Sequence, residues 1–398
     1  MDKAIDSTTE APEAVAKAEP AERRAQFQVH VAGNDLERRR LYEFRYKVLV
    51  QELGLGGPNV DSERRMVRDQ RDQRAQHLFV TADGEIAGCL RLVTAERTPP
   101  TEDMRIAYDL DAFQDLPPKR LTFSDRLAVA EAWRSSRVPA LLTAAAFKLA
   151  RSSGARFDFT HCPPALIGLY EKMGYRAYSG NFLQSEVGLQ VPMILVMDDI
   201  AHLTSLNSPF AQLALQYKLD QATTAWFHKT FPEVAHRPIK ALRDEKRFWE
   251  YLTKRLHQNP LHGIPLFDGL TYTEASRFLK DATTLALREG DMLVREGELG
   301  EEMFVLLSGT VEVRDGADRT LTSFGKGQAV GEIAYLAATP RSADIVVTED
   351  TEVLVLTQAL FERLLAREPA IAAKILFSLS LILCERLRAT TQRLTAQG

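Results

Sequence analysis

Glu332 and Arg341 have the residue types and the spacing needed to bind a phosphate ester. Glu332 follows a glycine in the run Gly-Glu-Ile-Ala, and Arg341 begins the run Arg-Ser-Ala nine positions later. A bound phosphodiester needs a cation and backbone N–H donors, and a one-turn helix beginning at Glu332 would direct free N–H groups at one point. Arg341 can donate paired hydrogen bonds to phosphate oxygens, and Ser342 can donate another. Glu332 can accept a hydrogen bond from a ribose hydroxyl. A surface turn beside a solvated arginine would explain either residue alone, but not both together.

The elements around these residues have the pattern of a small β-roll. Thr271 and Glu274 form a capping box, which predicts a short helix that begins there and ends at Leu279. Short β-rich runs punctuated by glycines follow, a spacing typical of small barrels and rolls. Two helices, near residues 358–365 and 369–394, are expected to close this part of the chain. We therefore predict one domain over residues 263–398.

This stretch resembles the cyclic-nucleotide-binding domain family, which includes protein kinase A regulatory subunits and bacterial catabolite activator proteins. The family's phosphate cassette is Gly-Glu-(Leu/Ile)-Ala, followed by Arg-(Ala/Ser/Thr)-Ala. The matching residues of this sequence are Gly331, Glu332, Ile333, Ala334, Arg341, Ser342 and Ala343.

The resemblance implies that the ligand is cAMP, and cGMP stays open because a Ser or Thr beside the arginine can also favour guanine. In the bacterial activators, two adjacent hydroxyl residues of the long closing helix contact adenine. The resemblance therefore implies the same role for Thr390 and Thr391, with a frayed polar helix end as the alternative. No helix-turn-helix motif follows up to Gly398, so we expect the domain to control an activity that lies N-terminal to it.

A second set of residues suited to anion binding lies in the N-terminal part. A predicted strand at 120–130 leads into a basic turn with Arg134 and Arg137 and then into a helix. The N-terminus of a helix binds anions through its free N–H groups. The two arginines would neutralise a phosphate held near Ala140 and Leu141, and a solvated basic turn is the alternative.

Residues 26–200 alternate between strand and helix patterns, which predicts a mixed α/β domain. Strands are expected at 27–31, 77–82, 85–94, 120–130, 156–160 and 193–197, and helices at 36–53, 139–152 and 165–173. Asp83-Gly84 predicts a tight hairpin between the second and third strands.

This order resembles the Gcn5-related N-acyltransferase superfamily, and within it the N-acyl amino acid synthases and acyl-homoserine lactone synthases. The similar motifs are the strand Gly-Cys-Leu-Arg-Leu at 88–92, the run Tyr-Glu-Lys-Met-Gly-Tyr at 170–175, the Arg-Tyr-Lys-Val-Leu-Val opening at 45–50 and the pair Asp69-x-x-Asp72. The fold class implied is an acyltransferase mixed sheet with flanking helices, joined by a helical connector to a β-roll with closing helices.

The resemblance also implies the roles of particular residues in the attack of a neutral amine on a thioester. The backbone near Leu127 and Val129 would stabilise the oxyanion. The residues expected to take part in catalysis are Tyr170, as the acid for the thiolate, with Asp125 and Arg126. Contacts to the acyl donor are expected from Leu127, Val129, Arg134, Arg137 and Ala140. Contacts to the acceptor are expected from Arg45, Asp69, Asp72 and Arg91.

Two departures from the superfamily pattern affect these expectations. Arg137 stands where the superfamily has a glycine, and its side chain would crowd the pyrophosphate of coenzyme A. It would suit the single phosphate of a phosphopantetheine arm on acyl carrier protein, so both donors stay open. Phe123 stands where the synthases have a glutamate. Asp125 is the nearest replacement and should share the face of Phe123, because side chains alternate along a strand.

The rest of the chain and its composition limit the function classes. Residues 1–25 have the composition of a disordered tail, and residues 201–262 predict a helical connector rich in aromatics. The 398 residues have a net charge of −4 and three scattered cysteines, which is not typical of a nucleic-acid-binding or disulfide-stabilised protein. No transmembrane segment is expected, and the localisation expected is cytoplasmic. His77 and His161 lack partners at metal-binding spacing, so we expect both to be structural and no metal to be bound.

The leading hypothesis is an N-acyltransferase that is regulated by a cyclic nucleotide. The acceptor would be a small-molecule or protein amine, the donor an acyl thioester of acyl carrier protein or coenzyme A, and a second copy of the chain would bind through the closing helix. The alternatives are a cAMP-regulated protein-lysine acetyltransferase and a cAMP-responsive interaction protein without catalysis.

Overall fold

The computed structural model describes residues 25–134, 136–184, 187–236, 245–280, 282–337 and 339–397. The predicted tail, residues 1–25, lies outside the described residues except for its last position. By its contacts the chain divides into two compact units, which we treat separately. The first unit consists of Met1–Thr98 and Thr122–Gly154, and the second of Pro99–Leu121 and Ala155–Gly398.

The first unit is built on an antiparallel ladder of four strands. In spatial order these are β1 (Phe27–Val31), β4 (Gln76–Ala82), β5 (Glu85–Thr94) and β6 (Leu121–Val129). Asp83 and Gly84 both have a positive φ in the turn between β4 and β5, as the Asp-Gly pair predicts. A short hairpin of β2 (Val60–Asp61) and β3 (Met66–Val67) precedes the 3-10 turn η2 (Gln70–Gln73), and η5 (Glu131–Trp133) follows β6.

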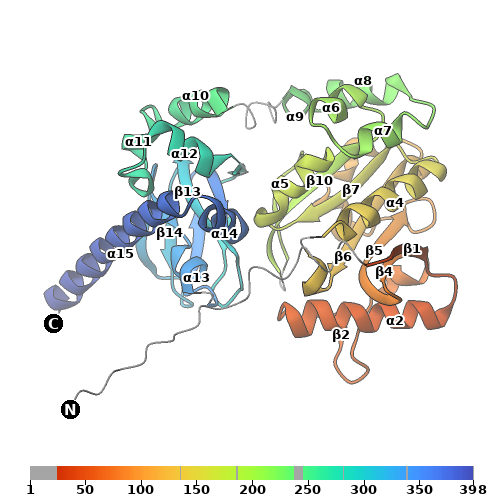
Figure 1. Ribbon diagram of the computed structural model, residues 1–398, viewed down its shortest axis with the longest axis horizontal. Helices are drawn as coiled ribbons and strands as arrows, with labels where there is room; N and C mark the ends of the chain where they lie inside the picture. The colour runs from red at the N-terminus through yellow and green to blue at the C-terminus, as the bar shows by residue number, and fades with distance from the viewer. Residues whose placement is uncertain are drawn as a thin grey trace, which may run out of the picture. The chain divides into compact units, whose positions relative to one another are not determined.

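Two helices cover this ladder. The first, α2 (Asp35–Arg45), continues as the π-helix η1 (Tyr46–Glu52), and it buries Leu41 and Phe44 against side chains of β4, β5 and β6. The second, α4 (Val138–Ser152), crosses the strands (Figure 1). It packs closely because residue 88 is glycine: a Cβ there would lie 2.8 Å from Cγ1 of Val138.

The second unit contains three parts, of which the first is a set of strands and short helices. Strand β7 (Phe157–Cys162) pairs with β10 (Gly188–Val196), which also pairs with β8 (Arg176–Ala177) and β9 (Phe182–Gln184). The helices of this part are α3 (Glu102–Ala107), η3 (Leu110–Phe113), η4 (Pro118–Arg120), η6 (Pro164–Leu166) and α5 (Ile167–Met173). Helix α5 ends at Gly174, whose φ is 109°.

The second part consists of α6 (Ile200–Ser205), α7 (Phe210–Ala214), α8 (Gln221–Thr230) and α9 (Pro232–His236). Aromatic residues join these helices to β7 and η3. The rings of Trp226 and Phe231 lie 5.2 and 5.5 Å from that of Phe113, and Trp226 lies 5.5 Å from Phe157. The first half of the predicted connector therefore packs on these strands.

The third part is a roll of two four-stranded sheets. Their spatial orders are β11 (Thr283–Leu287), β18 (Thr351–Thr357), β13 (Glu302–Ser308), β16 (Ala329–Val330) and β12 (Met292–Val294), β17 (Asp344–Val347), β14 (Val311–Arg314), β15 (Thr320–Phe324). The accompanying helices are α10 (Glu245–Leu256), α11 (Pro260–Gly263), η7 (Pro265–Phe267), α12 (Tyr272–Leu279), α13 (Glu332–Ala337), α14 (Gln358–Arg367) and α15 (Pro369–Gln397). The capping box of Thr271 and Glu274 is confirmed at the start of α12.

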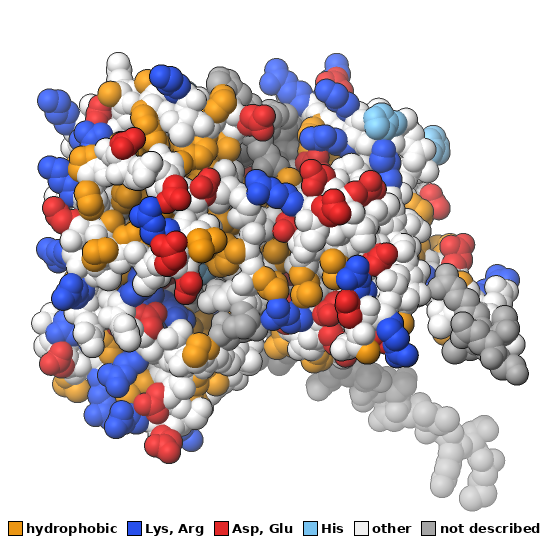
Figure 2. Space-filling view, turned by 180° about the vertical axis from the view of Figure 1, so that it is seen from behind, with side chains coloured by type: hydrophobic (Ala, Val, Ile, Leu, Met, Phe, Trp, Pro, Cys, Tyr) orange, Lys and Arg blue, Asp and Glu red, His pale blue; other side chains and the backbone are white. Residues whose placement is uncertain are grey.

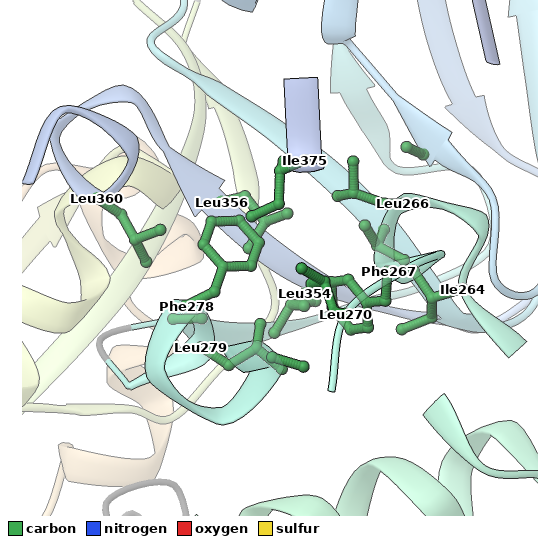
Figure 3. Close-up of a cluster of buried hydrophobic side chains, with 14 of the residues drawn as sticks. Ile264, Leu266, Phe267, Leu270, Phe278, Leu279, Leu354, Leu356, Leu360 and Ile375 are labelled. Carbon is green, nitrogen blue, oxygen red and sulfur yellow. The ribbon is translucent and has the colours of Figure 1, made fainter. Parts of the chain in front are cut away.

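The core of the roll joins its helices to one face of the first sheet. Figure 3 shows side chains of α12, β18 and α15, among them Phe278, Leu354 and Ile375, in one apolar cluster. Phe248 and Leu252 of α10 belong to the same cluster. The second half of the predicted connector therefore packs in the core of the roll.

Two features are relevant to binding of nucleic acid and to insertion into a membrane: the charges on the surface and the length of the apolar helices. On the face drawn in Figure 2, Lys and Arg side chains of the described residues are interspersed with Asp and Glu. None of the helices in the described ranges is both long and apolar enough to cross a membrane.

Candidate functional site

Arg341 is the centre of the predicted phosphate site in the roll. Arg341 is 5% exposed, and its guanidinium donates to the carbonyl of Gly331 at 2.9 Å and to the carbonyl of Glu302 at 2.8 Å. Two glycines make room for it. A Cβ at Gly300 would lie 2.2 Å from the Arg341 Nη2 atom, and one at Gly331, whose φ is 81°, would lie 2.9 Å from Nη1. The local sequence thus holds a buried cation beside the start of α13.

Glu302 is the carboxylate partner of this cation, with its Oε1 atom 3.1 Å from Arg341 Nη2. Burial raises the pKa of Glu302, and the Arg341 guanidinium offsets only part of that rise. The guanidinium of Arg341 is buried, and its partners are two carbonyls and a carboxyl whose pKa is raised. Its positive charge is therefore well suited to bind a phosphate monoanion.

Glu332 is 4% exposed at the start of α13 and bonds to the closing helix. Its Oε1 atom lies 2.7 Å from Nη1 of Arg386 on α15. Arg386 also stacks on Phe324, with its Cζ atom 4.2 Å from the ring centroid, and donates to the carbonyl of Ala329 at 2.5 Å. The carboxylate predicted to accept from a ribose hydroxyl is thus also the contact between the cassette and α15.

The other predicted cassette residues differ in exposure. Ala334 is buried and Ala343 half-buried, whereas Ile333 and Ser342 are exposed. Thr390 and Thr391 are exposed on α15, and their hydroxyls donate to backbone carbonyls one turn earlier, each at 2.9 Å. Their contact with a base therefore stays a prediction.

Sequence reasoning did not assign Gly300, Glu302 or Arg386 to this site. Glu302 and Gly300 precede Arg341 by about 40 positions, and no local spacing links them to it. Arg386 lies one helical turn before Thr390, so both side chains lie on the same face of the helix. That spacing could have indicated that Arg386 belongs to the site.

The predicted acceptor residues meet in the first unit as a group of four arginines and three aspartates, which we call the arginine–aspartate cluster. Its members are Arg45, Arg71, Arg91, Arg126, Asp69, Asp72 and Asp125. Helix α2 supplies Arg45, β5 supplies Arg91, β6 supplies Asp125 and Arg126, and the segment around η2 supplies the rest.

The inner part of the cluster is closed to solvent. Arg45 and Asp72 form an ion pair at 2.8 Å with side chains 0% and 2% exposed. His77 is held between them, with Nδ1 3.0 Å from Arg45 Nη2 and Nε2 2.9 Å from the carbonyl of Asp72. Burial lowers the pKa of His77. The contacts among these three side chains hold α2, the segment around η2 and β4 together.

The outer part of the cluster reaches the surface. Arg91 donates to both oxygens of Asp125, at 2.6 and 2.8 Å, and to Asp69 at 2.5 Å. Arg71 donates to Asp125 at 2.9 Å, and Arg126 donates to Asp69 at 3.2 Å. The side chains of Arg71 and Arg126 are 19% and 22% exposed, so they form the solvent edge.

Asp125, the predicted replacement for the synthases' glutamate, accepts hydrogen bonds from Arg91 and Arg71, and it is a poor candidate for a base. Burial works to raise its pKa, yet the Arg91 guanidinium and its hydrogen bonds hold the pKa well below the usual range. The pKa values of Asp69 and Asp72 are also lowered, against the effect of burial, by Arg91 and Arg45 respectively. Carboxylates held so firmly ionised are weak proton acceptors. Phe123 shares the face of Asp125, since Arg71 lies 5.7 Å over the Phe123 ring.

The strand β6 has an irregularity at the predicted oxyanion position. Cys89 pairs with Ala128 and Arg91 with Asp125, so two residues of β6 stand opposite one of β5. Arg126, the first of the two, has a φ of 54°, a left-handed conformation that is unfavourable for arginine. The bulge takes Arg126 and Leu127 out of the ladder, which is the arrangement needed for a free backbone donor.

The predicted donor turn is partly neutralised by its own surroundings. Arg134 donates to Glu52 of η1 at 2.6 Å, and Arg137 lies 4.8 Å over the ring of Phe27. The N–H of Leu141 donates to the carbonyl of Arg137 at 3.0 Å. Among the described contacts, Ala140 keeps the N–H that a ligand could use, whereas Leu141 does not.

Tyr170 and His161 lie in the second unit. Tyr170 is 8% exposed on α5, with its ring edge-on to that of Tyr175 at 5.4 Å. His161 is half-buried on β7, and its Nδ1 atom lies 2.5 Å from the hydroxyl of Tyr108. The acid role of Tyr170 stays a prediction.

Two family models match the chain. Residues 284–368 match the cyclic nucleotide-binding domain, and residues 44–144 match an acetyltransferase (GNAT) domain. The resemblances to the cyclic-nucleotide-binding domain family and to the Gcn5-related N-acyltransferase superfamily are thus confirmed, and so is the mixed α/β fold followed by a β-roll with a closing helix. The likeness to the synthases within that superfamily stays a prediction.

Curated relatives and solved structures match part of the chain. The cAMP-dependent protein kinase regulatory subunit of Hypocrea atroviridis is 30% identical over 159 residues, which cover 39% of this chain and 34% of the relative. The cyclic AMP receptor protein of Thermus thermophilus is 33% identical over 132 residues, which cover 32% of this chain and 59% of the relative. The solved catabolite activator protein of Thermus thermophilus is 31% identical, with a TM-score of 0.30 over 33% of this chain and 62% of that one. The chain spans 34% to 40% of the length of the first curated relatives.

Proposed function

We propose that the chain is an N-acyltransferase regulated by a cyclic nucleotide, because residues 284–368 match the cyclic nucleotide-binding domain and residues 44–144 match the acetyltransferase (GNAT) domain. The observation that carries the proposal is Arg341, a buried guanidinium beside the start of α13 in the same chain as the acyltransferase fold. Residues 263–398 would be the sensor, residues 26–200 the catalytic domain and residues 201–262 the connector.

The ligand we propose is cAMP. Both relatives described above are named for cAMP, and the arginine is followed by Ser342 as in the bacterial activators. In the proposed complex Arg341 binds the cyclic phosphate, Glu332 accepts from the ribose hydroxyl, and Thr390 and Thr391 contact the base. Guanine would use the same hydroxyls differently, so cGMP is the competitor to include in any titration.

The regulation we propose acts through Glu332. A ribose hydroxyl that donates to this carboxylate competes with Arg386, which now lies 2.7 Å from it. Nucleotide binding would therefore change the position of α15 and shift the population of states of the domain.

The proposed reaction joins an amine to an acyl group. The amine nitrogen forms a bond to the thioester carbonyl carbon, the amine gives up a proton to a base or water, and the carbon–sulfur bond breaks. The oxyanion would be stabilised by the backbone at the β6 bulge, near Leu127, and the leaving thiolate would take a proton from Tyr170. A phosphopantetheine arm on acyl carrier protein is the donor we favour, because Arg134 and Arg137 are already engaged by Glu52 and Phe27.

Product formation tests the proposal directly. The purified chain is incubated with octanoyl-coenzyme A or octanoyl-acyl carrier protein and a mixture of amines, with and without cAMP, and the products are identified by mass spectrometry. We expect an N-octanoyl product whose rate of formation depends on cAMP in the native chain but not in Arg341→Ala. Equal rates with and without the nucleotide at saturating donor would refute the regulation.

The second candidate function is a cAMP-responsive interaction protein that does not catalyse acyl transfer. The observation that favours it is the donor turn, where Glu52 neutralises Arg134 at 2.6 Å. Any turnover of a thioester that is lost in Tyr170→Phe would exclude it.

A homodimer through α15 is also part of the proposal. Among the side chains of this helix that the structure describes, three large apolar ones are exposed: Phe377 by 66%, Leu381 by 50% and Leu387 by 68%. Light scattering of the native chain and of Phe377→Ser/Leu381→Ser tests it, because a dimer held by this face should dissociate in the double variant.

A further inference from the structure

We propose that Glu302 competes with the nucleotide for the guanidinium of Arg341, and that its carboxylate takes up a proton from solvent when the cyclic phosphate binds. The affinity for the nucleotide would then depend on pH. The inference rests on the proposed binding of a cyclic nucleotide and adds a form of regulation to that site. Glu302 lies outside the residues that the cassette pattern assigns to the phosphate.

The first support is the way in which the N–H groups of Arg341 are already used. A guanidinium binds two oxygens at once through a pair of nitrogens, either Nε with Nη2 or Nη1 with Nη2. Both pairs include Nη2. In the structure Nη2 donates to the carbonyl of Glu302 at 2.8 Å and to its Oε1 atom at 3.1 Å. Since Nη2 carries two N–H groups, a phosphate bound by either pair must displace one of these acceptors.

The carboxylate of Glu302 is the acceptor that can be displaced. The carbonyl belongs to β13, and its position is fixed by the pairing of that strand with β16 and β18. Arg341 is also held in place, because Nη1 donates to the carbonyl of Gly331 at 2.9 Å and its backbone N–H donates to the carbonyl of Glu298 at 2.8 Å. The carboxyl group, in contrast, is at the end of a side chain with rotatable bonds. The phosphate and this carboxylate are therefore two anions that compete for one N–H group.

The surroundings of the displaced carboxylate favour its protonated form. The side chain of Glu302 is 12% exposed. Burial raises the pKa of Glu302, and the charge and hydrogen bond of Arg341 offset part of that rise in the free site. A bound phosphate would remove the hydrogen bond and add a negative charge beside the carboxyl group, and both changes raise the pKa further. The complex would therefore hold one more proton than the free site, taken from the acid form of the buffer.

The charged groups nearest to this pair act in the same direction. Glu301, the exposed neighbour on β13, adds to the rise in the pKa of Glu302. Glu298, in the loop before β13, also has a pKa that burial raises, although Arg295 and Arg341 lower it in part. Three carboxyl groups thus lie around one buried cation, which makes a further negative charge unfavourable unless a proton accompanies it.

The other elements that pack on β13 bring no charge that would replace Arg341 as the partner of Glu302 in the described structure. On α13, Glu332 is paired with α15, and burial raises the pKa of Tyr335, so its hydroxyl stays protonated. On α10 and β18, Arg255 and Glu352 form an ion pair at 2.7 Å, at the opposite end of β13. A proton is therefore the simplest way to compensate the displaced carboxylate.

The sign of the pH dependence follows from the extra proton in the complex. Since the bound site holds more protons than the free site, nucleotide binding is favoured as the pH falls and weakened as it rises. The range lies above 4.5, the ordinary pKa of glutamate, because burial raises the pKa of Glu302 already in the free site. One linked proton changes the Kd by up to about tenfold per pH unit. The phosphodiester of cAMP is ionised across this range, so it would not contribute.

Calorimetry of the full-length protein measures the linked proton directly. cAMP is titrated at about pH 5, 6, 7 and 8, each in buffers of different ionisation enthalpy, and the slope of the binding enthalpy against the ionisation enthalpy gives the number of protons taken up. We expect an uptake of roughly 0.3 to 1 proton at one or more of these pH values, and a Kd that rises about tenfold over the series.

Glu302→Gln and Glu301→Gln are the matched variants. The amide of Glu302→Gln is neutral at every pH, so this variant should take up no proton and should bind cAMP about three- to tenfold more tightly than the native chain at pH 8. Glu301→Gln removes the same charge one residue away without removing a partner of Arg341. It should keep the proton uptake and the pH dependence of the native chain.

Three results would overturn the inference. They are a Kd of the native chain that is independent of pH with no proton uptake, an unchanged uptake in Glu302→Gln at a melting temperature that matches the native chain, and an equal loss of uptake in Glu301→Gln.

The proposed function is judged separately by the assay of acyl transfer. Proton-linked binding of cAMP without any acyl transfer would support the inference and refute the acyltransferase. Transfer that depends on cAMP, with binding that is independent of pH, would do the reverse. No binding of cAMP or cGMP at millimolar concentration would refute both.

Discussion

Replacing Arg341 by alanine should abolish nucleotide binding at ordinary concentrations, for a reason that can be quantified. The guanidinium is 5% exposed, so its bond to a phosphate would form away from water. Removing one partner of a buried, hydrogen-bonded charge pair costs about 2–5 kcal/mol, which weakens binding roughly 30- to 5,000-fold. Calorimetric titration with cAMP measures the loss. An affinity within about threefold of the native chain would refute the assignment of the phosphate site.

The same substitution should destabilise the unliganded roll, because it removes the cation beside Glu302. Burial already raises the pKa of this carboxyl, and without Arg341 it should take up a proton more readily. The loss in unfolding free energy is expected to be roughly 1–3 kcal/mol. The double variant Arg341→Ala/Glu302→Gln should recover much of the melting temperature, because the amide is neutral, but not the binding of cAMP.

Thermal unfolding with nucleotide separates the two effects. A ligand at 100 times its Kd stabilises the folded state by about 2.7 kcal/mol, and this shift should vanish in both Arg341 variants. The matched control is Arg319→Ala, since Arg319 forms an ion pair with Asp315 but its side chain is 79% exposed. An equal loss of binding in that control would show that the effect of Arg341 is not local.

Three further predictions concern the acyltransferase part. Glu52→Gln removes the carboxylate that neutralises Arg134, so the affinity for coenzyme A should rise a few-fold in a calorimetric titration; a fall would contradict the proposed donor turn. The pKa values of the three cluster aspartates are lowered in the folded state, so their contribution to stability is present above about pH 4 and is lost as the pH falls further. Hydrogen exchange of β4–β6 between pH 7 and pH 3 checks this, and uniform protection would contradict it. Gly88→Val should cost roughly 1–3 kcal/mol by forcing α4 off β5 at Val138, and an unchanged melting temperature would show that the contact yields freely.

The sequence was most informative where function depends on residues close together in the chain. The cassette from Gly331 to Ala334 with Arg341 could be predicted because a helix N-terminus and an arginine nine positions later form one local unit. The hairpin at Asp83 and Gly84 and the capping box at Thr271 were predicted for the same reason, since each is determined by two to four neighbouring residues.

Contacts between distant segments could not be predicted. Glu302 meets Arg341, and Arg386 meets Glu332, only because the roll brings β13 and α15 to the cassette. The spacing of these residues along the sequence does not indicate either contact. The pattern predicts that Asp69 and Asp72 contact the acceptor, and this stays a prediction. It could not show that Asp72 is buried against Arg45 or that Arg71 and Arg126 form the solvent edge.

The connector shows a different limit of sequence reasoning. Its helical pattern was evident, but periodicity shows that a helix has an apolar face and not what covers that face. The aromatic residues of α8 pack on η3 and β7, whereas Phe248 of α10 packs in the roll. One stretch of uniform composition thus belongs to two hydrophobic cores.

This division of the helices has a consequence for how such a chain can be assembled and taken apart. Within the described residues, the apolar cluster of the roll includes side chains of α10 but of no earlier helix, and the aromatic cluster around Phe113 includes none later than Phe231. A gene joined or cut between codons 236 and 245 would therefore leave both clusters whole. If residues 245–398 bind a cyclic nucleotide as proposed, grafting them onto another enzyme would give a reporter for cyclic nucleotides whose own apolar cluster is retained.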